Sequence, residues 1–90
     1  MGKIKDGIMS NGLSWLSGMP QTDITGDGRI RIENHRGIYN FTSESVTVDA
    51  PGMSIIITGD HLDIRYMSGE SIEITGRISN IAYNHNGDLR

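Results

Sequence analysis

From Arg29 onward the chain is a succession of short runs in which apolar and polar residues alternate. In Arg29-Ile30-Arg31-Ile32-Glu33 every second residue is isoleucine, and the pattern returns in residues 45–49, 62–66 and 72–75. Successive side chains of a β-strand point to opposite faces, so a period of two indicates strands with one buried face. Clusters of Gly, Ser, Asn, Asp and Pro, which favour turns, separate the runs. The sequence therefore predicts an almost wholly β structure after Pro20.

The length of 90 residues suits a single domain. We predict a mainly β, antiparallel meander of about seven short strands, folded as a small sandwich, roll or barrel. The β domain is expected to span residues 21–84 and to be followed by a polar tail, residues 85–90. The run Ile55-Ile56-Ile57-Thr58 is apolar on both faces, which is typical of a central strand. A short β-solenoid is the alternative architecture, because the strands recur at similar intervals.

Residues 1–20 differ from the rest because their apolar side chains follow a helical period. Ile4, Ile8, Trp15, Leu16 and Met19 fall near one side of a helix. Glycines at positions 7, 12 and 18 weaken such a helix, since each costs about 1 kcal/mol relative to alanine. We expect a short amphipathic helical segment over residues 1–20. It either caps the sheet or folds only against a partner or a membrane surface, with Trp15 as its anchor.

The composition excludes several classes of function. The chain has no cysteine, which rules out disulfide bonds, thiol catalysis and cysteine-ligated zinc. Its net charge of −3 comes from interspersed charges of both signs, without the basic surface that nucleic-acid binding requires. The residues after Met1 lack the apolar run of a signal peptide, and no segment has the length and hydrophobicity of a membrane span. We expect a soluble, intracellular protein.

No pattern in the sequence predicts an active site. The segment Asp23–Gly28 begins like a calcium loop, but Thr25 and Asn34 stand where that loop requires acidic ligands. The three histidines lie far apart in the sequence, and the serines lack the G-x-S-x-G setting of a hydrolase nucleophile. We therefore expect a protein that is not an enzyme and has no metal, no cofactor and no small-molecule substrate.

The tetrapeptide Asn34-His35-Arg36-Gly37 separates two strand-like runs, residues 29–33 and 38–42. Asparagine and glycine both tolerate positive φ, so the sequence predicts that these runs form a hairpin with the tetrapeptide as its turn. Such a turn would present His35 and Arg36 at its tip, either as solvated side chains or as a recognition site. In the second case Arg36 would contact a carboxylate of a partner, or brace the hairpin through Glu33 or Glu44.

The hexapeptide Ile32-Glu33-Asn34-His35-Arg36-Gly37 resembles the hallmark of the YabP/YqfC family of sporulation proteins, and specifically of its YqfC branch. The resemblance continues in the same order over the greater part of the chain, although the glycine-rich N-terminal segment departs from the family pattern. The further matching segments are Gly18-Met19-Pro20, Phe41-Thr42, Ile55–Gly59, Leu62–Ile64, Glu70–Ile78 and Ile81–Tyr83.

The resemblance implies a non-enzymatic protein that acts in spore morphogenesis through protein–protein interaction. Its partner would be a membrane protein of the YqfD type, and the chain would lie in the cytoplasm of the sporulating cell, peripheral to a membrane. The residues expected to form the interaction site are Glu33, Asn34, His35, Arg36, Gly37 and Trp15. The alternative is a self-assembling β scaffold, a homo-oligomer or filament that needs no membrane partner.

The absence of cysteine and the scattered histidines lead to one prediction. The purified full-length protein should contain neither zinc nor calcium in stoichiometric amount, because at least three converging ligands are needed to hold such an ion. Elemental analysis after extensive dialysis measures this directly. One metal ion per chain that resists dialysis and is removed by a chelator would contradict the prediction.

Overall fold

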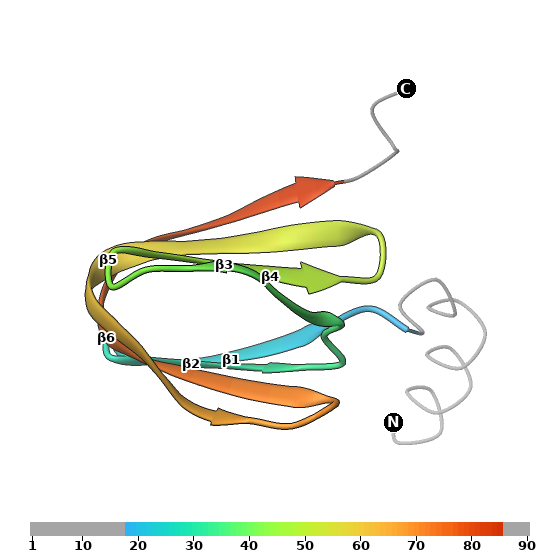
Figure 1. Cartoon of the computed structure of the whole chain (residues 1–90), viewed down its shortest axis with the longest axis horizontal. Helices are drawn as coiled ribbons and strands as arrows, with labels where there is room; N and C mark the ends of the chain where they lie inside the picture. Colours follow the sequence, from blue (N-terminus) through green and yellow to red (C-terminus); the bar gives the residue numbers. More distant parts are fainter. Residues whose placement is uncertain (1–17, 86–90) are drawn as a thin grey trace, which may run out of the picture.

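A computed structural model describes residues 18–85, and six antiparallel strands make up this part of the chain in one sheet. The sheet order is β1-β2-β6-β5-β4-β3 (Figure 1). The strands are β1 (Gln21–Thr25), β2 (Arg29–Glu33), β3 (Gly37–Phe41), β4 (Ser45–Ala50), β5 (Met53–Met67) and β6 (Ser71–His85).

The mainly β, antiparallel fold is as predicted, with six described strands rather than about seven. Two of them are much longer than the sequence pattern suggested. The strand order departs from the predicted meander at one point, because β2 lies beside β6 and not beside β3. The solenoid alternative is wrong, because every strand pair is antiparallel. Strand β6 ends at His85, one residue beyond the expected boundary of the β domain. Residues 1–17, which hold most of the expected helical segment, and tail residues 86–90 lie outside the described residues.

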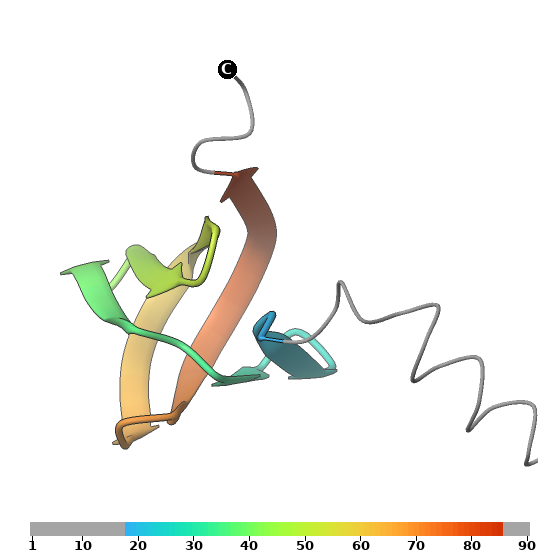
Figure 2. The same cartoon turned by 90° about the vertical axis from the view of Figure 1, so that its right-hand side faces the viewer.

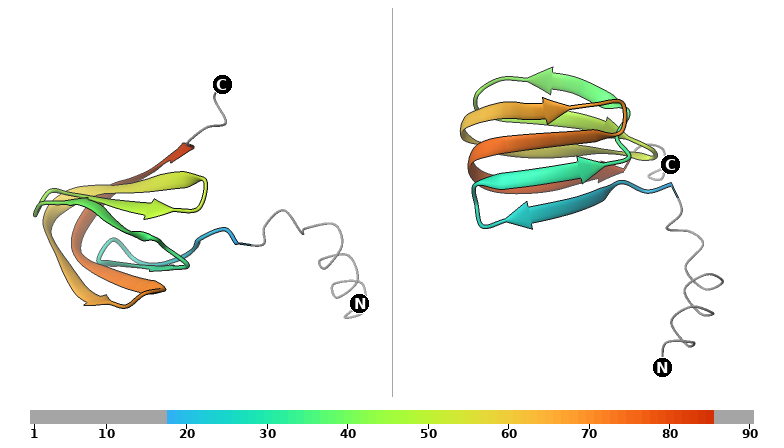
Figure 3. Two further views of the ribbon diagram at one scale, coloured as in Figure 1. Left: turned by 45° about the vertical axis from the view of Figure 1, so that its right-hand side comes forward. Right: turned by 90° about the horizontal axis from the view of Figure 1, so that it is seen from below.

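The sheet is folded over on itself, because β5 and β6 contribute to both layers of the domain. Each of these strands is 15 residues long and bends near its middle. The upper layer contains β3, β4, the first half of β5 and the second half of β6, whereas the lower layer contains the other halves with β1 and β2 (Figures 1 and 3). The result is a small sandwich made from one sheet.

Two glycines allow the bends. A Cβ atom on Gly59 would lie only 2.0 Å from the carbonyl oxygen of Arg77. A Cβ atom on Gly76, whose φ is +139°, would lie 2.6 Å from the carbonyl oxygen of His61. Real Cβ atoms do not approach backbone atoms so closely, so only glycine lets the backbones of the two bent strands come this close. The strand register also shifts at this point, next to Gly59 and again between Asp60 and Asp63.

Turns from both sides of the sheet supply hydrogen-bond acceptors at the bends. In β5, the N–H of Gly59 donates to the carbonyl of Glu44 (3.0 Å) and that of Leu62 to the carbonyl of Ser43 (2.8 Å). In β6, the N–H groups of Gly76 and Ile78 donate to carbonyls of the β1–β2 turn, at 3.2 and 2.8 Å. These four backbone donors at the bends are thereby paired and do not carry the cost of an unsatisfied hydrogen-bonding group.

The core lies between the two layers and is built from aliphatic side chains and Met53. Alternate residues of β2, β4, β5 and β6 point into it, as the period-two runs predict. Strand β5 pairs with β4 and β6, which confirms that residues 55–57 belong to a central strand. The buried core residues are Ile30, Ile32, Val46, Val48, Ala50, Met53, Ile55, Ile57, Leu62, Ile72 and Ile74.

The predicted hairpin between residues 29–33 and 38–42 is wrong. Strand β2 pairs with β1 and β6, and β3 pairs with β4, so the two runs belong to different layers. The segment 34–36 crosses from the lower to the upper layer at the end of the sandwich opposite the bends (Figure 1). Positive φ at Asn34 and Gly37 serves a crossover as well as a turn. The local residues therefore could not distinguish the two.

The bend at Gly59 leads to a stability prediction. Gly59→Ala should lower the free energy of unfolding by at least about 3 kcal/mol, since the new methyl group meets backbone that cannot move without breaking the ladder. Gly69→Ala is the matched control, because its Cβ would meet nothing within 4 Å. It should stay within about 1 kcal/mol of the parent. Urea unfolding followed by circular dichroism measures both, and equal stability of the two variants would contradict the prediction.

Candidate functional site

The crossover, residues 34–36, is tied to both layers by its backbone. The N–H of Asn34 donates to the carbonyl of Glu70 (2.6 Å), which also accepts a longer bond from the N–H of His35 (3.4 Å). The N–H of Arg36 donates to the carbonyl of Asp49 in β4 (2.7 Å). Glu70 belongs to the β5–β6 turn of the lower layer and Asp49 to the upper layer. The crossover therefore holds the two layers together at the open end of the sandwich.

His35 fills the space between the layers at this end. Its side chain is buried, with 6% of its surface exposed, and its Nε2 lies 3.0 Å from the carbonyl oxygen of Ser68. That contact requires Nε2 to carry the proton and donate it. Nδ1 is also buried and has no hydrogen-bond partner among the described residues. His35 is thus a buried structural residue, and it does not lie at the exposed tip of a hairpin as predicted.

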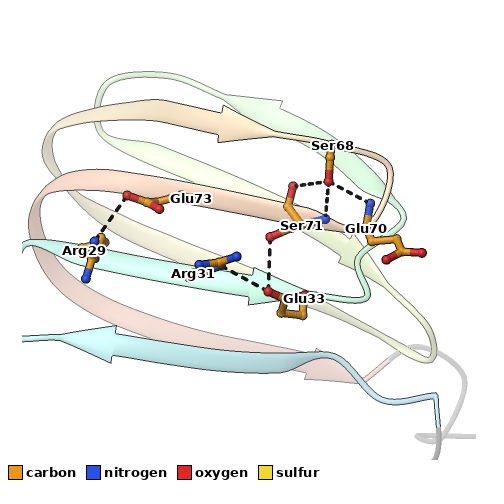
Figure 4. Close-up of polar contacts among 7 residues, drawn as sticks. All are labelled: Arg29, Arg31, Glu33, Ser68, Glu70, Ser71 and Glu73. Atoms are coloured by element: carbon orange, nitrogen blue, oxygen red, sulfur yellow. Dashed lines mark hydrogen bonds and ion pairs between the residues drawn. The ribbon is translucent and has the colours of Figure 1, made fainter.

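The turn that receives His35 is ordered by its own serine. The hydroxyl of Ser68 accepts hydrogen bonds from the N–H groups of Glu70 (3.3 Å) and Ser71 (3.0 Å), as Figure 4 shows. A side-chain oxygen that bonds to the backbone two and three residues later is typical of a Ser turn. The Ser68 carbonyl is therefore held in place for His35.

Glu33, at the end of β2, is engaged within the chain. Its Oε2 lies 3.2 Å from Nε of Arg31 and accepts a hydrogen bond from the hydroxyl of Ser71 at 3.4 Å (Figure 4). A second ion pair, Arg29–Glu73 at 3.7 Å, lies on the neighbouring strands. Both pairs are partly exposed, so each contributes at most about 1 kcal/mol to stability. The outer face of the lower layer therefore carries charges of both signs, some of which are paired within the chain.

Asn34 fastens the segment before β1. Its side-chain Nδ2 donates to the carbonyl of Gly18 at 2.6 Å and to that of Met19 at 3.2 Å. The backbone of Asn34 has a φ of +66°, which asparagine tolerates better than most residues. Asn34 therefore has two roles. Its backbone adopts the left-handed region, and its side-chain amide donates hydrogen bonds to two carbonyls. Gly37 begins β3 with a φ of +141°, where glycine is favoured.

The side chain of Arg36 is exposed, whereas that of His35 beside it is buried. The ion pairs among residues 18–85 are Arg29–Glu73, Arg31–Glu33 and His61–Asp60, so none of them includes Arg36. The expected bracing contact of Arg36 with Glu33 or Glu44 is therefore absent from the described part of the chain. Of the residues predicted for the interaction site, residues 33–37 lie together at the open end of the sandwich, whereas Trp15 lies outside the described residues.

A second candidate site lies at the bends, at the other end of the molecule. A shallow hollow of about 370 Å³ is lined there by Asp27, His61, Gly76 and Arg77. Nδ1 of His61 lies 3.2 Å from a carboxylate oxygen of Asp60, and both side chains are exposed. In the described part of the chain, no three His, Cys, Asp or Glu side chains are grouped closely enough to hold a metal ion. The hollow lies at the bends, and the described residues that line it do not form a metal site.

The segment that begins like a calcium loop is a hairpin turn. Asp23 lies within β1 opposite Arg31, and the turn is closed by a hydrogen bond from the N–H of Gly28 to the carbonyl of Thr25 at 3.2 Å.

Sequence reasoning missed the exposed aromatic residues on and near the sheet edges, of which Tyr39, Tyr66 and Tyr83 are the clearest. The sequence pattern predicts that these residues lie in strands, but it does not show which strands lie at an edge of the sheet. Among the described residues, no helix is long and apolar enough to cross a membrane.

The buried position of His35 leads to a second stability prediction. His35→Ala should lower the free energy of unfolding by about 2–4 kcal/mol, because it leaves a void at the end of the core and removes the donor to the Ser68 carbonyl. His35→Gln should lose less, since its amide can still donate. His85→Ala, at an exposed position in β6, should stay within about 0.5 kcal/mol of the parent. Thermal and urea unfolding measure these values. A His35→Ala variant as stable as the parent would contradict the prediction, because the buried imidazole would then contribute nothing to stability.

Comparison with known proteins agrees with the resemblance of the sequence. The family model described as the YabP family matches residues 19–90, which include the whole described sheet and the crossover. No curated protein matches the chain. The family model covers well over half of the chain, and the chain therefore belongs to the YabP family.

Proposed function

We propose that this chain acts in spore formation as a non-enzymatic protein that binds another protein through the surface around Arg36. Membership of the YabP family is consistent with a sporulation-related role. The observation that carries the proposal is that Arg36 is exposed and takes part in none of the ion pairs of residues 18–85, whereas its neighbours are engaged within the chain.

The neighbours of Arg36 have structural tasks that explain their residue types. Asn34 donates to two carbonyls at positive φ, His35 fills the end of the core, and Gly37 adopts a φ that favours glycine. None of these tasks requires a guanidinium at position 36, since only the backbone N–H of that residue contributes to the crossover. The side chain is therefore available for a contact outside the described chain.

The chemistry of Arg36 suggests the kind of partner. A guanidinium binds a carboxylate with two parallel hydrogen bonds, a geometry that lysine cannot reproduce. The crossover backbone is hydrogen-bonded to both layers, so the backbone at Arg36 does not have to be ordered when a partner binds. We propose an acidic group of a membrane protein as the partner. In the YqfC branch of the family, to which we assign the chain, this would be a protein of the YqfD type, and the chain would lie at the cytoplasmic side of a membrane.

A second function, a self-assembling β scaffold, is favoured by a different observation. The described sheet is open, so its outer strands leave backbone hydrogen-bonding groups unpaired. This surface lies along the strands rather than at the crossover. The two functions can therefore be tested by separate variants.

The proposal predicts that Arg36→Ala abolishes co-purification of the membrane partner and lowers the yield of heat-resistant spores. The unfolding free energy should change by no more than about 0.5 kcal/mol, because the side chain is exposed. Arg36→Lys should also bind poorly if the contact is bidentate. The experiment uses tagged full-length protein isolated from sporulating cells, with thermal unfolding of each variant measured in parallel.

Arg77→Ala is the matched control, since Arg77 is also exposed but lies at the bends, opposite the crossover. It should bind and sporulate like the parent. If Arg36→Ala retains the partner and the spore yield of the parent, the proposed site is wrong. If it loses both together with stability, the residue acts on folding and the interface role fails.

A further inference from the structure

The described sheet presents four unpaired stretches of strand, and three of them carry features that prevent association. Strand β1 has Asp23 within its five residues, and β3 is short and contains a bulge between Ile38 and Asn40. The second half of β5 carries Asp60, Asp63 and Arg65 as well as register shifts. Charges and bulges on edge strands are the usual means of avoiding edge-to-edge pairing. These three edges are therefore protected.

The fourth edge, residues 80–85 in the second half of β6, has none of these features. The segment Asn80-Ile81-Ala82-Tyr83-Asn84-His85 contains no Asp, Glu, Lys, Arg, Gly or Pro. It pairs with β5 in an unbroken register, from Thr58↔Asn80 to Met53↔His85. No described strand pairs with its other side, because β2 reaches only residues 71–75 of β6. In Figure 2 this part of β6 forms the margin of the upper layer.

Side chains at this edge are more exposed than their positions in the sheet would suggest. Tyr83 lies opposite Ile55, which is fully buried, so it belongs to the inner face of the upper layer. Nevertheless 47% of its surface is exposed. Ile81, opposite buried Ile57 on the same face, is only partly buried. A further strand beside β6 would cover both side chains and pair the free backbone groups.

We propose that this edge pairs, antiparallel and about a twofold axis at Ala82, with the same edge of a second copy of the chain. A twofold axis perpendicular to the sheet keeps inner faces together, so each residue meets a residue of the same face. With Ala82 at the axis, Ile81 lies opposite Tyr83 of the second copy, and Asn80 lies opposite Asn84. An aromatic residue opposite a β-branched one and two facing amides are favourable cross-strand pairs, and no like charges meet.

The second copy is the occupant that the residues favour, because the edge is complementary to itself in this register. Ala82 is the midpoint of residues 79–85, that is, of the edge together with uncharged Ser79, so the register pairs every residue of the edge. The outer face of the upper layer is also nearly free of charge, and its central row is Asn40, Thr47, Ile56 and Ala82. Pairing would extend this row into the second copy. Two edges that meet in this way leave no further β6 edge, so the assembly closes as a dimer.

This dimer does not depend on the proposed function. Its contact lies along β6, and Arg36 takes no part in it. Failure of the partner-binding test at Arg36 would leave the dimer untouched, and a monomeric protein would leave the Arg36 proposal untouched.

Light scattering coupled to size exclusion tests the proposal on the 90-residue chain, whose mass is 9.9 kDa. The parent should elute with twice the monomer mass. Ala82→Lys should convert it to the monomer mass, because two like charges then face each other at the axis. Ala82→Glu should do the same, and an equal mixture of the Lys and Glu variants should recover the dimer. Thr47→Lys, in the same outer row but on an inner strand, is the control and should remain dimeric.

Cross-linking gives a second measurement that does not depend on charge. The natural chain has no cysteine, so Ala82→Cys introduces a single thiol. Residues opposite each other on antiparallel strands have Cβ atoms about 4.5–5.5 Å apart, close enough for a disulfide after a small adjustment. Oxidation should convert most of the Ala82→Cys protein to a covalent dimer, and Thr47→Cys should remain uncrosslinked.

Three outcomes would overturn the proposal. The first is a parent protein with the monomer mass at concentrations of about 100 µM, since most specific dimers are tighter than this. The second is an open-ended polymer, which a closed twofold contact does not produce. The third is a dimer that survives Ala82→Lys unchanged, which places the contact elsewhere.

Discussion

The close approach of the β5 and β6 backbones at Gly59 and Gly76 is the constraint on which the rest of the structure depends. A Cβ atom at either glycine would lie within 3 Å of the backbone of the other strand, so the close approach of β5 and β6 at the bends requires glycine. The bends convert a single sheet into a sandwich with an aliphatic core, which a domain of this size needs in the absence of disulfides. The turns at residues 26–28 and 42–44 complete the bends by accepting the backbone donors that bending releases.

A sheet folded in this way is closed at one end and open at the other, and the crossover closes the open end. Its backbone bonds to both layers, and His35 occupies the space between them. The segment Asn34–Arg36 is therefore first a structural element that joins β2 to β3 between the two layers. Because the crossover backbone is hydrogen-bonded to both layers, the backbone position from which the exposed Arg36 side chain extends is fixed.

The molecule separates its surfaces by charge. The outer face of the lower layer carries the Arg29–Glu73 and Arg31–Glu33 pairs, whereas the outer face of the upper layer is formed by Thr, Ser, Asn, Ile and Ala with few charges. The unprotected edge of β6 belongs to the neutral layer. Arg36 stands at the crossover between the two. A dimer along β6 and a partner at Arg36 would use different surfaces, so both can be occupied at once.

The sequence by itself determined the strand-forming runs from Arg29 onward and the residues of the core, but not β1, the length of β5 and β6, or the role of residues 34–37. Period-two runs such as residues 29–33 and 72–75 place isoleucine on one face of a strand. Because that face is stabilised by removal from water, the pattern indicates which side chains form the core. The sequence also indicated that residues 34–37 needed asparagine and glycine at positive φ. Only the tertiary structure decided that this segment crosses between layers, that His35 is buried and that β6 has an open edge. These properties depend on which strands become neighbours, and that choice arises from the bends at Gly59 and Gly76, where backbone atoms distant in sequence come into contact.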